Sequence, residues 1–335
     1  EIDIKAARAL LQGDAQTAIS LLNEGLIENP EHISFLMRKG IALEALGNLE
    51  EAIVLFEKVL EINPKHQSSS QRRLKCGLKI WQAEEYFEEI TRATRAFPGN
   101  INHQFGRLNY VLSVKKDYQM ALDIVKSCLF IHPDHQRSHL YLGLVHSWMG
   151  SHEEARKAIG KCLIRWPMSN EVFITASQIE KNAGDPTKQI EHINSMLKIN
   201  GLLPVASASR DRAITPEFLS TQTDYSVDDG RLVSIVMTTY KRDPLLNAAI
   251  GSILNQTYRN IELLIVDDCS PDDNFSYLKE LAEKDDRIRV YQMEENGGTY
   301  LAKNFAMTQA NGDFIGFMDS DDYCHAQRIE FQMSS

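Results

Sequence analysis

Three carboxylates follow a short apolar segment near the C-terminal end of the sequence. The apolar residues run from Phe314 to Met318, and Asp319, Asp321 and Asp322 come directly after them. Such a run, bounded by Gly and Asp, is typical of a buried strand, and residues i and i+2 of a strand point the same way. Asp319 and Asp321 can therefore converge on a divalent cation that holds a diphosphate. Taken alone, the same residues are equally consistent with a solvated acidic turn.

Polar residues also follow two other predicted strands. The strands predicted at 232–237 and 261–266 are followed by these residues: Thr238, Tyr240, Asp267 and Asp268. Ligands of an open α/β sheet lie outside the carboxyl ends of its strands. We therefore expect these side chains and the acidic cluster to share one edge of a sheet, which would be a binding site.

The elements that position these residues alternate from residue 232 onward. Strands are predicted at 232–237, 261–266, 287–293 and 314–318, and helices at 244–256, 271–284 and 299–310. Strands that alternate with helices predict a parallel, right-handed, doubly wound sheet. Residues 232–335 are therefore predicted to form an α/β, Rossmann-like nucleotide-binding domain.

Three other phosphate chemistries match this region poorly. No Gly-x-Gly-x-x-Gly follows the first strand, so the glycines of a dinucleotide site are missing. The segment 297–304 resembles a P-loop, but Ala302 and Asn304 replace two of its four defining residues. An aspartyl-phosphate nucleophile loop would need Thr or Val where Tyr323 stands. The P-loop and the nucleophile loop remain weak alternatives.

The first two hundred residues contain an internal repeat. Prolines recur at steps of 34, 34, 35 and 34 residues, at Pro30, Pro64, Pro98, Pro133 and Pro167. A second series has the same steps: Gly13, Gly47, Trp81, Lys116, Gly150 and Gly184. Five residues after each of these stand Ala18, Ala52, Tyr86, Ala121, Ala155 and Gln189. Pro ends a helix and Gly permits a tight turn, so the pattern predicts pairs of antiparallel helices.

The period of 34 residues resembles the tetratricopeptide repeat, with five or six units over residues 1–200. The third unit departs from the pattern, because Trp81 and Tyr86 replace small residues. Such arrays form a superhelix with surfaces for protein partners, so the resemblance implies partner binding or self-association; a simple spacer is the alternative. Residues 201–231 lose the period and are predicted to be a linker.

Five motifs in the second domain resemble the family 2 inverting glycosyltransferases of the GT-A fold. They lie at residues 233–240, 253–258, 261–270, 296–299 and 317–322, in the order that the family shows. The resemblance implies a UDP- or other NDP-sugar donor and a saccharide acceptor. A GT-A domain of this family is about twice as long, so we expect 232–335 to be its N-terminal half, truncated at the C-terminus.

The resemblance also implies roles for residues at the first two strand ends. Thr238 and Tyr240 would form the pocket for the base, with Tyr240 stacked on its face. Asp268 would accept a hydrogen bond from the base, and Asp267 would assist it. Lys303 stands where relatives often have Arg, and it would face the diphosphate without the bidentate geometry of Arg.

The acidic cluster takes its role from the same resemblance. Asp319 and Asp321 match the Asp-x-Asp motif that reaches the ribose and a metal-bound diphosphate, and Asp322 would assist. The implied cofactor is Mn²⁺ or Mg²⁺, which offsets charge on the leaving nucleoside diphosphate. The catalytic base is expected beyond residue 335, so no residue here is nominated for it.

Composition sets further limits. The formal net charge is −10 and no long basic cluster is present, which argues against a nucleic-acid partner. No apolar run reaches the roughly 18–20 residues of a transmembrane segment. Five cysteines without a disulfide-like framework favour a reducing compartment. We expect a cytoplasmic protein, or one held at the membrane periphery by its partners.

Two functional hypotheses remain. The first is a glycosyltransferase that acts with inversion in polysaccharide or glycan biosynthesis, with repeats that bind a partner. Under this hypothesis residues 1–335 alone would bind the donor without turning it over. The second is a non-catalytic scaffold whose α/β domain is degenerate or merely binds nucleotide.

Overall fold

The structure is a computed structural model that describes residues 1–207, 214–221 and 223–334. The chain divides into two compact units, Glu1–Met149 and Gly150–Ser335. This boundary lies inside the helical region predicted for residues 1–200, so the predicted repeats contribute helices to both units. Over the described residues, we find no helix long and apolar enough to cross a membrane.

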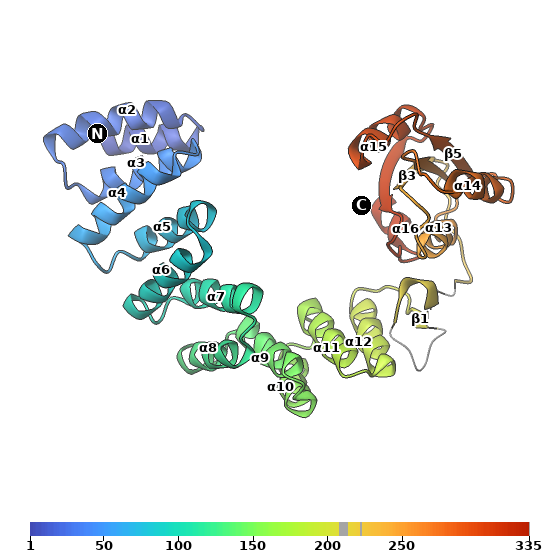
Figure 1. The fold of residues 1–335 in the computed structure, drawn as a ribbon, viewed down its shortest axis with the longest axis horizontal. Helices are drawn as coiled ribbons and strands as arrows, with labels where there is room; N and C mark the ends of the chain where they lie inside the picture. The colour runs from blue at the N-terminus through green and yellow to red at the C-terminus, as the bar shows by residue number, and fades with distance from the viewer. Residues whose placement is uncertain (208–213, 222, 335) are drawn as a thin grey trace. The chain divides into compact units, whose positions relative to one another are not determined.

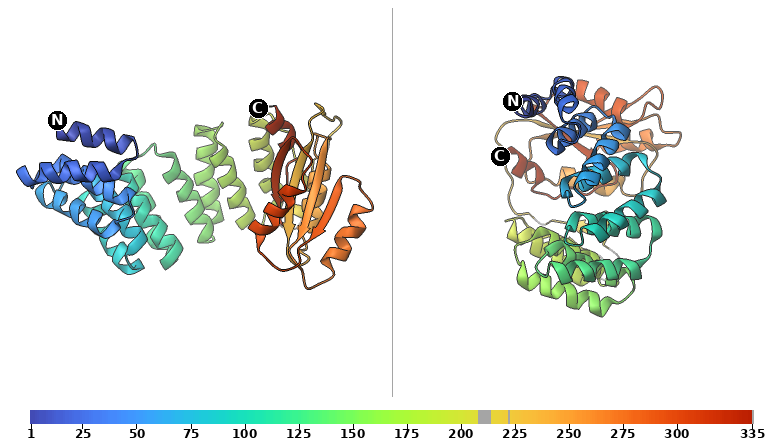
Figure 2. Two further views of the ribbon diagram at one scale, coloured as in Figure 1. Left: turned by 90° about the horizontal axis from the view of Figure 1, so that it is seen from above. Right: turned by 90° about the vertical axis from the view of Figure 1, so that its left-hand side faces the viewer.

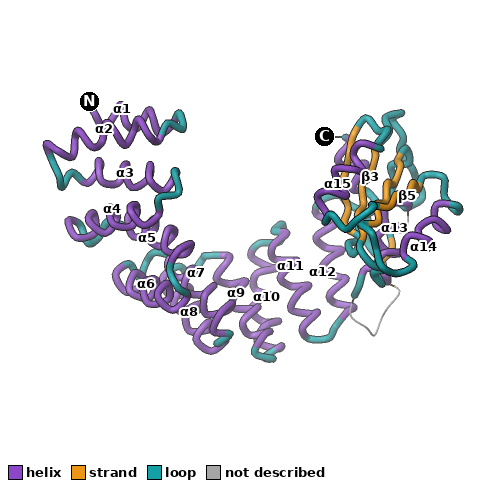
Figure 3. Tube along the Cα trace, turned by 45° about the horizontal axis from the view of Figure 1, so that its top comes forward, coloured by secondary structure: helices purple, strands orange, loops and turns teal. Residues whose placement is uncertain are grey.

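The first unit consists of helices arranged as successive antiparallel pairs (Figures 1 and 3). Its elements are α1 (Ile2–Leu11), α2 (Ala15–Glu28), α3 (Ile33–Ala45), α4 (Leu49–Ile62), α5 (Gln67–Ile80), α6 (Ala83–Ala96), α7 (Ile101–Tyr110), the π-helical turn η1 (Val111–Lys115), α8 (Tyr118–Ile131) and α9 (Gln136–Trp148). The fold predicted from the 34-residue period, a tetratricopeptide-like helical array, is therefore confirmed.

The turn and contact positions of the repeat have the predicted roles. Gly13 and Gly47 adopt left-handed backbone angles, with φ of 80° and 83°, where a Cβ is disfavoured. Lys116 occupies the same turn with φ of 52°. Ala18 and Ala52 are fully buried, as close packing between helices requires. The sequence period thus reports a real structural repeat.

The turn of the third repeat has a different backbone conformation. Trp81 is extended, with φ of −77°, and its ring lies against Gly77 in the preceding turn of α5. A Cβ on Gly77 would lie 2.1 Å from a ring atom of Trp81, so only glycine leaves room for the indole there. Tyr86, which replaces the small residue, is buried beside Tyr110, with ring centroids 6.5 Å apart.

The second unit begins with three more helices. These are α10 (His152–Arg165), α11 (Asn170–Asn182) and α12 (Pro186–Ile199). Glu180 is buried within them, and the Arg156 guanidinium binds it through two nitrogens, with Nη2 2.6 Å from Oε2 and Nε 3.1 Å from Oε1. The paired geometry offsets the cost of burying the carboxylate.

From β3 onward, the second unit is an α/β domain whose strands are all parallel in one sheet (Figure 2). Its elements are β3 (Val233–Thr239), α13 (Leu246–Leu254), β4 (Ile261–Asp267), α14 (Asn274–Ala282), β5 (Ile288–Gln292), α15 (Thr299–Thr308), β6 (Phe314–Asp319) and α16 (Arg328–Met333). The strand order is β5-β4-β3-β6. The predicted α/β class and parallel sheet are therefore confirmed. The prediction that 314–318 forms a buried strand is wrong, because β6 lies at an edge of the sheet and is exposed at four of its six positions.

Alternate residues of the central strands face opposite layers. Ile235 and Leu263 pack in the apolar cluster that contains α13 and α14. Val236 and Leu264 pack on the other face, against Ala302 of α15. Both β3 and β4 are buried at every position, which explains why their sequences are nearly continuous apolar runs.

The segment that was predicted to be a linker is attached to the α/β domain at several points. It contains β1 (Ala206–Ser207), η2 (Pro216–Phe218) and β2 (Leu219–Ser220). The Leu203 amide donates to Gln327 Oε1 at 2.6 Å, and the Leu203 carbonyl lies 2.9 Å from His325 Nε2. The side chain of Asn194, in α12, bonds both the amide and the carbonyl of Val205, each at 2.9 Å. We call residues 203–227, where described, the strap.

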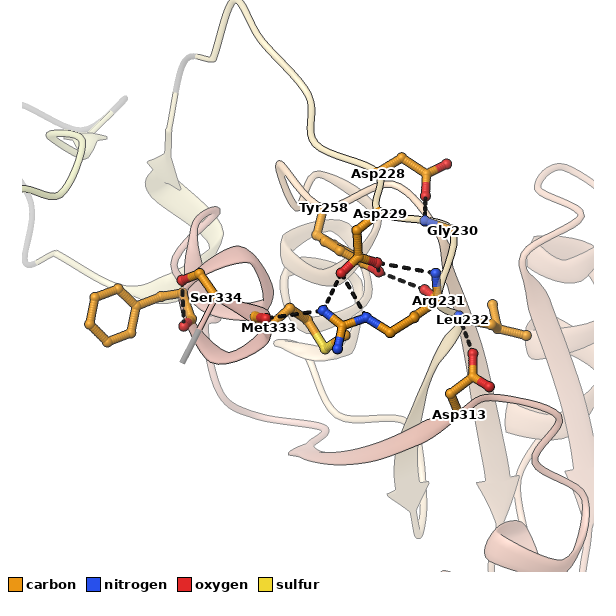
Figure 4. Close-up of polar contacts among 10 residues, drawn as sticks. Asp228, Asp229, Gly230, Arg231, Leu232, Tyr258, Asp313, Met333 and Ser334 are labelled. Carbon is orange, nitrogen blue, oxygen red and sulfur yellow. Dashed lines mark hydrogen bonds and ion pairs between the residues drawn. The ribbon is translucent and has the colours of Figure 1, made fainter.

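The last residues before β3 form a polar cluster (Figure 4). Asp229 accepts hydrogen bonds from Arg231 and from the Tyr258 hydroxyl, and Arg231 also donates to the Met333 carbonyl at 3.2 Å. Arg231 and Tyr258 hold the pKa of Asp229 well below its usual range. Burial and the Asp229 charge raise the pKa of Tyr258 to about 12. This cluster ties the entry of β3 to α16.

Candidate functional site

A cavity of about 500 Å³ opens at the carboxyl ends of β3 and β6. Thr238 and Asp319 are partners in the parallel register between these two strands. The chain order reverses here, because β4 and β5 lie on one side of β3 and β6 lies on the other. Ligands of doubly wound sheets bind at such a switch point. The lining residues are Thr238, Thr239, Tyr240, Asp268, Thr299, Tyr300, Lys303, Asp319, Ser320 and Asp321.

Thr238 and Tyr240, at the end of β3, both line the cavity. Thr238 is buried, whereas Tyr240 is 50% exposed, with the Lys241 ammonium 5.4 Å from the centroid of its ring. The next residue, Lys241, has φ of 64° and its amide donates to Ser270 Oγ at 2.7 Å. This contact fixes the loop after β3 to the loop after β4.

Asp268 lies at the cavity and organises the loop before α15. Its Oδ1 accepts from the Gly297 amide at 2.9 Å and its Oδ2 from the Gly298 amide at 2.8 Å. Gly298, the N-cap of α15, has φ of 81°, which favours glycine. Each carboxylate oxygen can accept a second hydrogen bond. Asp268 can therefore hold the loop and still face a ligand.

Asp267, its neighbour, has a different environment. It is fully buried and is not among the cavity-lining residues. Its carboxylate accepts hydrogen bonds from the Ser270 amide at 3.0 Å, from Asn274 Nδ2 at 2.7 Å and from Gln292 Nε2 at 3.1 Å. These bonds join the ends of β4 and β5 to α14, which is a structural task. The ligand contact predicted for Asp267 has no counterpart in this geometry.

The acidic residues after β6 contribute two carboxylates to the cavity. Asp319 and Asp321 line it, whereas Asp322 does not. Lys303 Nζ lies 2.9 Å from Asp319 Oδ1. Over the described residues, no group of three or more His, Cys, Asp or Glu side chains is arranged to hold a metal ion. Two carboxylates still fit Mg²⁺ or Mn²⁺, because such ions complete their shell with phosphate oxygens and water.

Four lining residues were not nominated from the sequence: Thr239, Thr299, Tyr300 and Ser320. Thr299 and Tyr300 begin α15, whose N-terminal end therefore faces the cavity. The positive end of a helix dipole attracts anions such as phosphate. A sequence signal for Thr299 and Tyr300 was present, namely the Gly297-Gly298 pair, which precedes a predicted helix at the same edge of the sheet.

Comparisons with known families agree with both parts of the chain. Residues 234–334 match the family Glycosyl transferase family 2, and residues 9–74 match a tetratricopeptide repeat family. Among solved structures, the chain aligns with a tetratricopeptide protein of Thermus thermophilus, TTC0263, at 18% identity and a TM-score of 0.38, covering 50% of this chain and 92% of that one.

Several curated proteins are similar in sequence. An uncharacterized glycosyltransferase of Haemophilus influenzae is 38% identical over 103 residues, covering 31% of this chain and 41% of that protein. The Escherichia coli protein WfgD, named a UDP-Glc:alpha-D-GlcNAc-diphosphoundecaprenol beta-1,3-glucosyltransferase, is 42% identical over 106 residues, covering 32% of this chain and 41% of WfgD.

A third similarity extends over both parts of the chain. An uncharacterized glycosyltransferase of Rickettsia conorii, RC0461, is 29% identical over 237 residues, covering 70% of this chain and 36% of that protein. The matches thus span at most 41% of the length of these three relatives. The match to glycosyl transferase family 2 thus lies at residues 234–334, and the match to a tetratricopeptide repeat family precedes it in the same chain.

Proposed function

We propose that this protein is a glycosyltransferase that moves a sugar from a nucleotide-sugar donor to a saccharide acceptor with inversion. The observation that carries the proposal is the cavity at the switch point between β3 and β6. It combines a half-exposed aromatic ring, two carboxylates, a lysine and a helix N-terminal end. A nucleoside diphosphate offers the complementary groups, namely a planar base, hydroxyls and a dianion.

The donor is placed by matching these groups. Tyr240 stacks on the base, and Thr238 lies beside it at the end of β3. The diphosphate lies at the N-terminal end of α15, where Lys303 can exchange its Asp319 partner for a phosphate oxygen. Asp319 and Asp321 would hold a divalent cation, which supplies electrostatic stabilisation of the leaving diphosphate.

The names of two relatives support the pathway that we propose. WfgD is named for glucosyl transfer from UDP-Glc, and a relative from Bacillus subtilis, TuaG, is named a putative teichuronic acid biosynthesis glycosyltransferase. We assign this protein to polysaccharide or glycan biosynthesis on that basis. The catalytic base is assigned to no residue of this chain. The repeats would dock a protein partner.

Nucleotide binding is the first test. Titration calorimetry of the chain with UDP, with and without Mn²⁺, should give binding that Mn²⁺ strengthens. Asp321→Ala should remove the Mn²⁺-dependent part, because one of two ligand carboxylates is lost. Asp286→Ala is the matched control, since this exposed carboxylate lies in the turn between α14 and β5. Absence of binding, or an unchanged Asp321→Ala titration, would refute the site assignment.

Transfer requires a separate test with the full-length gene product. A panel of UDP-, GDP- and dTDP-sugars should reveal hydrolysis or transfer that disappears in Asp321→Ala. If no donor is consumed while UDP still binds, the scaffold hypothesis replaces the enzyme. Repeat helices lie in both compact units, and this observation supports the scaffold hypothesis as the second candidate function.

A further inference from the structure

A second cavity, of about 330 Å³, lies between the third and fourth repeats of the first unit. Its lining includes Leu78, Trp81, Tyr86, Asn109, Tyr110 and Val114. Tyr86 and Tyr110 are buried, whereas Leu78 and Val114 are 63% and 51% exposed. Buried rings with exposed aliphatic groups beside them form an apolar pocket for a single bulky side chain.

This cavity coincides with the irregularities of the repeat. Trp81 and Tyr86 stand where other repeats have Gly and Ala. On the facing helix, a Cβ at Gly106 would lie 3.2 Å from the Tyr86 hydroxyl. The π-helical turn Val111–Lys115 follows on the same side of the cavity, and Val114 belongs to it. π-turns are often found at functional sites.

Val114, which lines the cavity, belongs to a series of exposed apolar residues. Leu46, Ile80, Val114 and Trp148 are spaced 34 residues apart, and they are 46%, 37%, 51% and 38% exposed. Each lies at or just beyond the end of the first helix of its repeat, so the four occupy equivalent positions of the array. A recurring exposed apolar position along an array favours an extended partner.

Three of the helices beside this series carry basic residues and no acidic ones. Helices α5, α7 and α9 and the turn η1 contain no Asp or Glu, but they carry seven cations: Arg72, Arg73, Lys75, Lys79, Arg107, Lys115 and Arg137. Three of these pair with acids of other helices: Arg72, Arg73 and Lys75. The other four make no ion pair with any described residue, and two of them lie over aromatic rings: Lys115 is 4.0 Å from the centroid of Phe87 and Arg137 is 4.9 Å from that of Phe105. Burial and the nearby Arg95 charge lower the pKa of Arg107, whose side chain has no offsetting acid.

The second helix of the third repeat has the opposite character. It begins with Glu84 and Glu85, which are exposed. Burial and the Glu84 charge raise the pKa of the cavity residue Tyr110. An acidic ligand would therefore avoid α6 and follow the acid-free side formed by α5, α7 and η1.

We propose that this side of the first unit binds an extended acidic segment of a partner protein, which inserts one bulky apolar side chain into the cavity lined by Trp81, Tyr86 and Tyr110. The inference rests on the partner-binding role proposed for the repeats and is independent of glycosyl transfer. The apolar side chain supplies affinity by leaving water. Carboxylates beside it pair with the unpaired cations and fix the direction of the segment.

Selection from a peptide display library on the full chain tests the proposal directly. Enriched peptides should carry several Asp or Glu residues around one Trp, Phe or Leu. Binding of a synthetic enriched peptide should weaken as salt rises. Val114→Ser and Leu78→Ser should each weaken it roughly tenfold, the effect of an interface contact worth about 1.4 kcal/mol. Lys115→Glu should weaken it at least as much.

Matched controls distinguish peptide binding in the pocket from nonspecific binding to exposed apolar side chains. Ile27→Ser removes an even more exposed aliphatic side chain, at 82%, from α2, and it should leave peptide affinity unchanged. Enrichment of basic or charge-free peptides would overturn the proposal. So would equal losses in Ile27→Ser and Val114→Ser, or displacement of the peptide by single-stranded DNA. If no peptide is enriched while the full-length protein still consumes a nucleotide sugar, this inference fails and the transferase proposal stands.

Discussion

The carboxylate of Asp268 offers a quantitative test of how the site is built. It accepts two backbone hydrogen bonds, from Gly297 at 2.9 Å and from Gly298 at 2.8 Å. In Asp268→Asn the side chain keeps its shape, but one acceptor oxygen becomes an NH₂ group that faces a backbone N–H. One hydrogen bond to a charged group is lost, at about 1.5–3 kcal/mol, and the other loses its charge. We expect the loop to open more easily by about 2–3 kcal/mol.

Hydrogen exchange read by mass spectrometry measures this change. Amides in a peptide that covers residues 294–301 should exchange roughly 30- to 150-fold faster, since 1.4 kcal/mol corresponds to a factor of ten. Asp272→Asn is the matched control, because Asp272 also accepts two backbone amides, those of Arg242 and Asn274. It should leave exchange at Gly297 and Gly298 unchanged. Unaltered exchange in Asp268→Asn would refute the loop-holding role of Asp268.

Three further predictions concern stability. Arg156→Ala leaves the buried Glu180 carboxylate unpaired and should cost about 3 kcal/mol in urea denaturation, and adding Glu180→Gln should recover part of it. Gly77→Ala pushes a methyl group into the Trp81 ring and should cost about 1–3 kcal/mol, with a shift in tryptophan fluorescence; unchanged stability would contradict the packing. Burial lowers the pKa of His103, so the unfolded chain binds its proton first as pH falls below about 6.5. Unfolding free energy should therefore drop on acidification below pH 6.5, less steeply in His103→Gln.

The repeat and the sheet could be predicted because local chemistry specifies them. The turns need a left-handed backbone, which glycines such as Gly47 adopt readily. Close contact between helices needs small residues such as Ala52, so both residue types recur with the period. The strands β3 and β4 are buried on both faces and are visible as apolar runs. Their polar ends meet at one edge because parallel strands align their carboxyl ends, which brought Thr238 and Asp319 into register.

The remaining features depend on contacts that no local pattern encodes. Asp267 and Asp268 are adjacent in sequence, but alternate residues of an extended chain point in opposite directions, and only Asp268 faces the cavity. Asp322 follows Asp321 by one residue and is likewise absent from the lining. The strap was predicted as a linker because its partners, such as Gln327, lie 124 residues away from Leu203.

That strap changes where the α/β domain begins as a folding unit. The motifs start at β3, but the side chains of His325 and Gln327 find their partners on the backbone of Leu203. Asn194 in turn binds both polar groups of Val205, so α12 is part of the same network. A protein that began at residue 232 would lack Leu203. The side chains of His325 and Gln327, which follow the acidic cluster, would then lose these hydrogen bonds. Helix α12 therefore supports the loop that follows the candidate site, in addition to its place in the last repeat.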